Sequence, residues 1–170
     1  MTIHLPTPGT VVPALTVLQP YAWLLAGGFK RNETRWSNLR SQADRIIGKW
    51  LAIHAGKSWD LVDDIIDVDV WRELDAIIAP ALGKHWPDDP NSMPRGVVVA
   101  IARVVAVHDG ERIIPSLTKR EFLLGGYGHR RIAIELDHLH QLVEPVPARG
   151  LQGMWSWTVP DNVHFQEVRS

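Results

Sequence analysis

The sequence predicts a single α+β domain built on a small mixed β-barrel with two to four flanking helices. Several short apolar segments are bounded by Gly or Pro, which is typical of strands. Few segments have helical periodicity, and strands and helices do not alternate along the chain, which argues against a parallel α/β sheet. A length of 170 residues is sufficient for one hydrophobic core.

The N-terminal part is expected to begin with a buried strand and a short helix. Residues 14–19 are apolar and end at Pro20, which is typical of a buried strand. Pro20 also favours the start of a helix over residues 21–26, and the pair Gly27-Gly28 ends it. Two more strands are predicted, over residues 30–36 and 50–55. The segment between them, residues 38–48, is expected to be irregular with one helical turn.

An acidic segment separates the two halves of the chain. Residues 61–78 carry apolar side chains at helical spacing, which predicts a helix there. A break at Asp67–Asp69 would divide it in two, with an Asp as N-cap. Residues 79–95 contain four prolines and are expected to form a loop. Between residues 58 and 90, nine acidic residues stand against two basic ones, a net charge of −7. We interpret this stretch as an acidic helical insert.

The C-terminal half contains the strongest strand pattern. Residues 96–107 form a continuous apolar run, which indicates burial on both faces for part of its length. Thr118 and Glu121 have the spacing of a capping box, which predicts a short helix ending at Gly125-Gly126. Three more strands are predicted over 131–136, 142–146 and 155–159. The predicted organisation is an N-terminal arm (1–13), a single domain (14–160) and a C-terminal tail (161–170).

Composition limits the classes of function. The chain has no cysteine, which excludes disulfides and thiolate metal sites, and it has no apolar run long enough to cross a bilayer. The N-terminus lacks the pattern of a signal peptide, so we expect a cytoplasmic protein with no membrane partner.

The net charge of −1 conceals a basic segment. Over residues 30–57, seven basic residues stand against two acidic ones, a net charge of +5 suited to phosphate groups. The alternative is a solvated face without a ligand.

A cluster of opposite charges follows the Gly-Gly pair. Lys30, Glu33 and Arg35 come directly after the first predicted helix, where buried elements fix their position. In a regular strand Glu33 and Arg35 share a face and Lys30 points to the other, so convergence needs a bend near Lys30. If the three side chains converge in a partly buried cleft, Glu33 stays ionised between two cations. The alternative is an ion-pair cluster that only fastens the corner between helix and strand.

Other candidates have structural alternatives as well. His54 ends an apolar strand and is either a hydrogen-bonded histidine at the edge of the core or a ligand-binding group. Trp155 is expected in the core, or lining a cleft. Arg131 follows a Gly-rich loop and could reach a phosphate. His138 and His140 lack a third ligand, so neither a metal site nor a cofactor is predicted.

Four blocks of the sequence, in order along the chain, carry a family resemblance. The blocks are Gln19-Pro20 with Trp23, Gly28, Lys30, Glu33 and Arg35-Trp36; Leu51–Ala55 with Lys57; Pro94–Val98; and Glu144–Gly150 with Gly153–Trp155. Together they resemble the ASCH domain (activating-signal-cointegrator homology), whose signature is roughly Gly-x-Lys-x-x-Glu-x-Arg. The resemblance covers about residues 15–157, interrupted by the acidic insert.

The resemblance implies a fold and a site. The fold is a PUA-like β-barrel, related to the RNA-binding domains of modification enzymes. The site is a cleft between the barrel and the first helix, with the Lys/Glu/Arg cluster at its base. Members of the family have been assigned roles in RNA or DNA binding. One bacterial branch resembles small amidohydrolases that act on acetylated cytidine, and another member resembles a ribonuclease.

Two functions are therefore predicted as alternatives. The first is a module that binds RNA or a nucleotide, with basic side chains on phosphate and a Trp and Gln19 on a base. Its predicted ligand-binding residues are Gln19, Trp23, Lys30, Glu33, Arg35, His54, Lys57, Arg131 and Trp155. The second is a small hydrolase acting on RNA or on a modified nucleoside, with Lys30 and Glu33 as the acid–base pair and Thr34 as a further catalytic candidate. The amidohydrolase branch has a Thr three residues after the Lys, where this chain has Glu33, and this departure favours binding.

Overall fold

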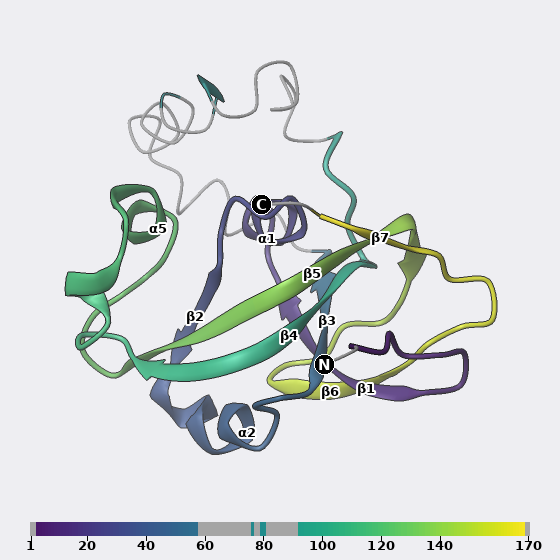
Figure 1. Cartoon of the computed structure of the whole chain (residues 1–170), viewed down its shortest axis with the longest axis horizontal. Coiled ribbons are helices and arrows are strands. Elements are labelled where there is room, and N and C mark those ends of the chain that lie inside the picture. The colour runs from purple at the N-terminus through teal and green to yellow at the C-terminus, as the bar shows by residue number, and fades with distance from the viewer. Residues whose placement is uncertain (1–2, 58–75, 77–78, 81–91, 169–170) are drawn as a thin grey trace.

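One curved sheet of seven strands, mostly antiparallel, forms the centre of a mixed α+β fold with few helices (Figure 1). The computed structural model describes residues 3–57, 76, 79–80 and 92–168. The strands are β1 (Val11–Val17), β2 (Asn32–Trp36), β3 (Trp50–Ala55), β4 (Val97–Asp109), β5 (Arg131–Pro147), β6 (Met154–Thr158) and β7 (Phe165–Glu167). The helices are α1 (Tyr21–Ala26), α2 (Arg40–Asp44) and α5 (Lys119–Leu123), with 3-10 turns η1 (Ser37–Leu39) and η4 (Ile114–Ser116).

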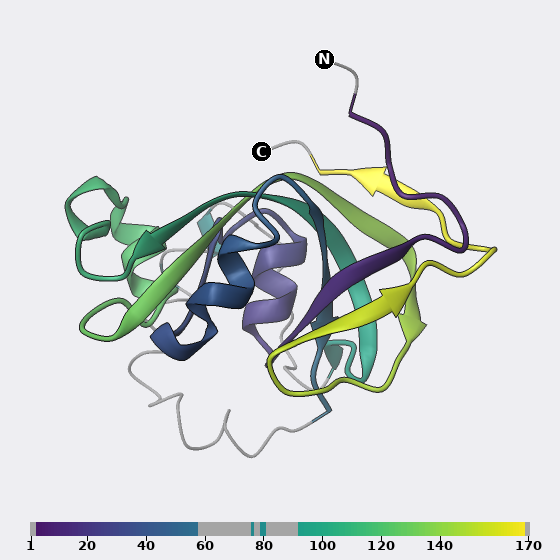
Figure 2. The ribbon, with the colours of Figure 1, turned by 90° about the horizontal axis from the view of Figure 1, so that it is seen from below.

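The strands follow the order β2-β5-β4-β3-β1-β6, and β7 also pairs with β5. β1 and β3 are parallel, and the other pairs are antiparallel. β3 and β4 are direct neighbours in which Ala55 pairs with Val97. Figure 2 shows the strong curvature of the sheet. Within the described residues β2 and β6 are not paired with each other, so the sheet does not close. The predicted α+β class is confirmed, whereas the closed barrel is not.

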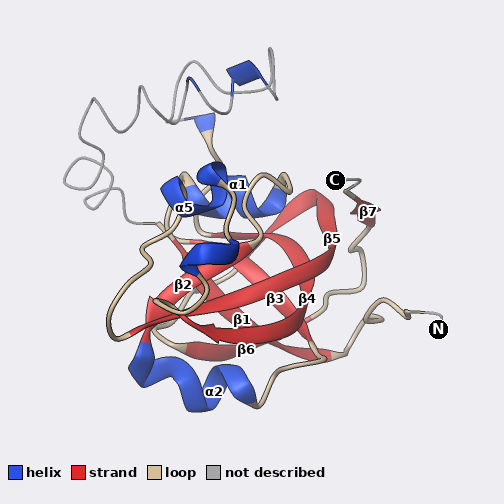
Figure 3. Cartoon of the chain, turned by 60° about the vertical axis from the view of Figure 1, so that its left-hand side comes forward, coloured by secondary structure: helices blue, strands red, loops and turns tan. Residues whose placement is uncertain are grey.

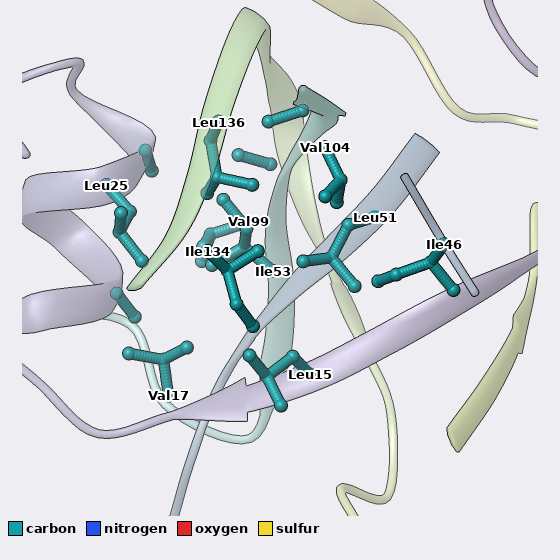
Figure 4. Packing of buried hydrophobic residues seen from close by; sticks show 14 of the residues in the cluster. Leu15, Val17, Leu25, Ile46, Leu51, Ile53, Val99, Val104, Ile134 and Leu136 are labelled. Carbon is teal, nitrogen blue, oxygen red and sulfur yellow. The ribbon is translucent and has the colours of Figure 1, made fainter. Parts of the chain in front are cut away.

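Apolar side chains cover both faces of the central strands. On one face, α1 and α2 pack against the sheet, and Figure 4 shows Leu25 of α1 near Val99 and Ile134. A second cluster, which includes Trp50 and Trp157, also draws residues from β3 and β4. Every residue of β3 is buried. This two-sided burial is what the continuous apolar runs predicted. No helix in the described part of the chain has the length and apolar character needed to span a membrane.

The predicted helices and strands match the structure best where the sequence signal lies within the element itself. The helix over 21–26 and the strand over 50–55 have the predicted bounds. The two strands predicted over 131–136 and 142–146 are one strand, β5, whose pairing with β4 shifts register three times. Such bulges bend a strand instead of ending it. The expected C-terminal tail contains β7, which pairs with β5 (Figure 3). The predicted helix over 61–78 lies outside the described residues, apart from Ala76.

Helix α5 begins with half of the predicted capping box. The Thr118 Oγ1 accepts a hydrogen bond from the backbone N–H of Glu121 at 3.1 Å. The Glu121 carboxylate turns to another element instead of the start of its own helix. It accepts the backbone N–H groups of Arg31 and Asn32 at 3.0 and 2.7 Å. A charged acceptor makes these bonds strong, so α5 is tied to the start of β2.

Candidate functional site

Lys30, Glu33 and Arg35 converge in one cavity, here called the charged cavity. The Lys30 Nζ donates to the Glu33 Oε2 at 2.6 Å, and the Arg35 Nε lies 3.1 Å from the Glu33 Oε1. The side chains of Lys30 and Glu33 are 2% and 8% exposed, and that of Arg35 is 29% exposed. The cavity has a volume of about 320 Å³. It is lined by Thr16, Val17, Leu18, Tyr21, Lys30, Glu33, Thr34, Arg35, Trp36, Leu124, Gly126 and Arg131.

The convergence depends on where β2 begins. The strand starts at Asn32, so Lys30 lies before it and does not follow its alternation. Gly28 has a φ of 76°, a conformation that glycine adopts without steric cost. The Leu24 carbonyl accepts the backbone N–H groups of both Phe29 and Lys30, which fixes the turn. The predicted bend is therefore present, and it brings Lys30 to the same side as Glu33.

The charged cavity is net positive. Burial alone would raise the pKa of Glu33, but Lys30 and then Arg35 hold that pKa below its ordinary value. The carboxylate therefore stays ionised between two cations, as predicted. Burial, followed by the charge of Glu33, raises the pKa of Tyr21. The Tyr21 ring lies 5.4 Å from the Lys30 Nζ. With Arg131, the described residues of the lining include three cations and a single carboxylate.

Trp36 and Arg131 form the accessible rim of the charged cavity. Trp36 is 61% exposed, which is high for a large aromatic residue. The Arg131 guanidinium lies 4.6 Å from the centre of the indole ring. The Arg131 Nε also donates to the Gly126 carbonyl at 2.9 Å, which orients the side chain. Sequence reasoning did not select Trp36. The available signal was its place beside Arg35 in the first ASCH-like block.

Thr34 also lines the charged cavity, although it follows Glu33 by one residue and strand alternation alone would place the two side chains on opposite faces. Its Oγ1 accepts the backbone N–H of Gly126 at 2.9 Å. The loop after α5 thus closes over the middle of β2 and brings this residue into the lining.

Gln19 and Trp23 make contacts within the fold and do not line the charged cavity. The Gln19 Nε2 donates to the Pro94 carbonyl at 2.7 Å, and its Oε1 accepts the backbone N–H of Trp23 at 2.9 Å. Gln19 is 1% exposed, so both ends of its amide are used within the fold. The Trp23 ring stacks on Phe29, with ring centres 5.6 Å apart. Neither Gln19 nor Trp23 belongs to the lining of the charged cavity.

His54 and Lys57 line a second cavity, here called the His54 cavity, with a volume of about 610 Å³. Trp155 lies against it, because its ring meets the His54 ring edge-on at 5.5 Å. Thr16 lines both cavities. Apart from Gln19 and Trp23, the predicted site residues are therefore divided between two adjoining cavities. Thr16 was not selected from the sequence, since nothing local distinguishes it.

His54 is a neutral histidine that fastens a loop. Its Nε2 lies 2.9 Å from the Ala148 carbonyl. A carbonyl oxygen only accepts, so we assign the proton to Nε2. The Nδ1 is buried without a hydrogen-bond partner among the described residues. Burial, opposed by the bond to Ala148 and reinforced by Lys57, lowers the pKa of His54.

The stability of the fold should therefore decrease in mild acid. Above pH 6.5, the ordinary pKa of histidine, His54 is neutral in both the folded and the unfolded chain. Below pH 6.5 His54 is protonated in the unfolded chain, whereas it stays neutral in the folded chain because its pKa there is lowered. The unfolding free energy then falls, by at most about 1.4 kcal/mol per pH unit, until the pH reaches the lowered folded pKa.

Urea titrations between pH 7.5 and 5 test this. The His54→Gln variant should lose part of the pH dependence, and His129→Gln, which removes an imidazole that is 80% exposed, should keep it. Equal pH dependence in wild type and His54→Gln would contradict the assignment.

No known protein-family model matches this sequence. Within the described residues, no group of three or more His, Asp or Glu side chains is placed to hold a metal ion. The described linings of the two cavities offer cations, one carboxylate and aromatic rings.

Proposed function

We propose that this chain is an ASCH-like domain that binds a nucleotide unit of single-stranded RNA in the charged cavity. The observation that carries the proposal is the combination of a net positive cavity with an exposed Trp36 at its rim. Cations hold phosphate, and an exposed indole stacks on a base. A volume of about 320 Å³ is at the lower end of the range for small-ligand pockets, which suits one nucleotide unit.

The residues divide into a support and a contact surface. Lys30 and Glu33 are buried and bonded to each other, so they support the cavity and fix its charge. Arg35 and Arg131 are more exposed and are the proposed phosphate contacts. The proposal includes a PUA-like barrel. The curvature of the sheet and the packing of α1 on one face support it.

A hydrolase is the second candidate, and one contact favours it. The Lys30 Nζ and Glu33 Oε2 are 2.6 Å apart inside a cavity that Thr34 also lines. An acid–base pair needs this hydrogen-bond distance. Incubation with single-stranded RNA and with acetylated cytidine, followed by chromatography of the products, tests this role. If the wild type hydrolyses either substrate and a folded Lys30→Gln variant does not, the hydrolase role is established. If the wild type leaves both substrates intact, the hydrolase role is excluded and RNA binding remains as the proposed function.

Replacing the exposed indole should weaken RNA binding. Base–aromatic stacking contributes about 1–3 kcal/mol, so Trp36→Ala should raise the Kd for an eight-residue RNA by about 5-fold to 150-fold. Fluorescence anisotropy at low salt measures the Kd. The fold should tolerate the change because Trp36 is 61% exposed.

Phe122→Ala is the matched control for this measurement. Phe122 is an aromatic residue of α5 that is 47% exposed and stacks on Tyr127, outside the lining of the charged cavity. It should keep the wild-type Kd. Equal affinities for the two variants, or no binding by the wild type, would overturn the proposed function.

A further inference from the structure

Among the residues that the structure describes, the lining of the His54 cavity has two cations and no carboxylate. Its lining is Thr16, His54, Gly56, Lys57, Gly96, Pro147, Ala148, Arg149 and Gly150. Lys57 and Arg149 are both exposed. A concave surface with charges of one sign concentrates ions of the other sign. Together with the charged cavity, the described lining residues comprise five cations and one carboxylate in two adjoining cavities, in a chain whose net charge is −1.

The loop that carries Arg149 is anchored on both sides of this residue. The Ala148 N–H donates to the Gly96 carbonyl at 3.1 Å, and the Ala148 carbonyl accepts from the His54 Nε2 at 2.9 Å. Gly150 packs on the His54 ring so closely that a Cβ there would lie 2.5 Å from the ring Cε1. Arg149 is therefore presented to the cavity by a backbone that is fixed on either side.

The Lys57 side chain lies along the wall of the same cavity. A Cβ added at Gly96 would lie 2.7 Å from the Lys57 Cε and 2.9 Å from its Cγ. Gly96 has a φ of 67°, which glycine adopts most readily. The Gly96 N–H donates to the Ala55 carbonyl at 2.7 Å, so the wall itself is fixed. The packed stem limits the freedom of the Lys57 ammonium, which lowers the entropy cost of holding an anion.

Thr16 joins the two cavities. The Arg35 guanidinium donates to the Thr16 carbonyl from the charged cavity. On the other side, the Thr16 Oγ1 donates to the Leu151 carbonyl at 3.1 Å and accepts from the Trp155 Nε1 at 3.2 Å. Among the described residues, Thr16 is the one that the two linings share, so the two cavities adjoin at this residue of β1.

We propose that the His54 cavity is a second phosphate subsite. Lys57 and Arg149 hold the next phosphate of a strand whose base and phosphate occupy the charged cavity. This inference rests on the proposed function. It makes the ligand an oligonucleotide of two or more units instead of a free nucleoside.

Salt dependence tests the subsite directly. The logarithm of the binding constant falls with the logarithm of salt concentration by about 0.7 for each neutralised phosphate of a single strand. The 170-residue chain is titrated with an octauridine RNA over a range of salt concentrations, and with uridine 5′-monophosphate at low salt. In the double variant Lys57→Gln/Arg149→Gln, which removes the contacts to one phosphate, the octauridine slope should become shallower by about 0.7. The preference for octauridine over the monophosphate should fall about tenfold or more.

The control double variant is Arg45→Gln/Lys49→Gln. It makes the same change in charge at exposed residues that line neither cavity. It should keep the wild-type slope and preference. If Lys57→Gln/Arg149→Gln behaves like this control, the subsite is overturned and the proposed function stands. If the wild type binds neither octauridine nor the monophosphate at low salt, both are overturned.

Discussion

Replacing Glu33 with Ala should lower the unfolding free energy by about 3–5 kcal/mol. The Lys30 side chain is 2% exposed, and Glu33 accepts its hydrogen bond at 2.6 Å. Without the carboxylate, the buried Lys30 amino group loses its partner, and Arg35 loses its counterion as well. Urea denaturation at pH 7, followed by tryptophan fluorescence, measures the loss.

Asp44→Ala is the matched control for this experiment. The Arg40 Nε and the Asp44 Oδ2 are 3.6 Å apart, and both side chains are more than 40% exposed. An exposed pair of this kind contributes about 0–1 kcal/mol. A loss below about 1 kcal/mol in Glu33→Ala would contradict the view that Lys30 depends on this carboxylate.

Replacing Glu121 with Ala should lower the unfolding free energy by about 3 kcal/mol. Glu121 is 8% exposed, and its carboxylate accepts the backbone N–H groups of Arg31 and Asn32. The change leaves two backbone donors at the start of β2 without their acceptor. The same urea titration measures the effect.

Two further variants separate this role from a loss of charge. Glu121→Gln keeps one acceptor oxygen and should lose less stability than Glu121→Ala. Glu111→Ala removes an exposed carboxylate, 59% accessible and 3.6 Å from His129, and should change the unfolding free energy by less than about 1 kcal/mol. If Glu121→Ala is as stable as Glu111→Ala, the hydrogen bonds to β2 are not what holds α5.

The predictable parts of the fold have local causes. Pro20 and Gly27 mark both ends of α1, and the apolar run over 50–55 is bounded well enough to define β3. β5 could not be recognised as one strand, because its bends follow bulges in the pairing with β4. Strand β7 exists through its pairing with β5, and its three residues carry no pattern of their own.

The candidate site also has one part that the local sequence predicts and another part that depends on contacts between distant residues. Lys30, Glu33 and Arg35 lie within six residues of one another, so their convergence could be predicted from a single bend. The contact between Glu121 and Asn32 joins residues 89 apart in sequence, and that between Trp155 and Thr16 joins residues 139 apart. Contacts over such separations depend on the order of strands in the sheet, which no local pattern encodes. For the same reason the division of the basic residues between two cavities emerged only from the structure.

The pairing of Ala55 with Val97 has a consequence for how this chain can change over evolutionary time. The strands on either side of the acidic insert are held together by their own ladder of backbone hydrogen bonds. That ladder sets no particular length, sequence or charge for the connection between β3 and β4. Selection can act on that segment for a purpose of its own.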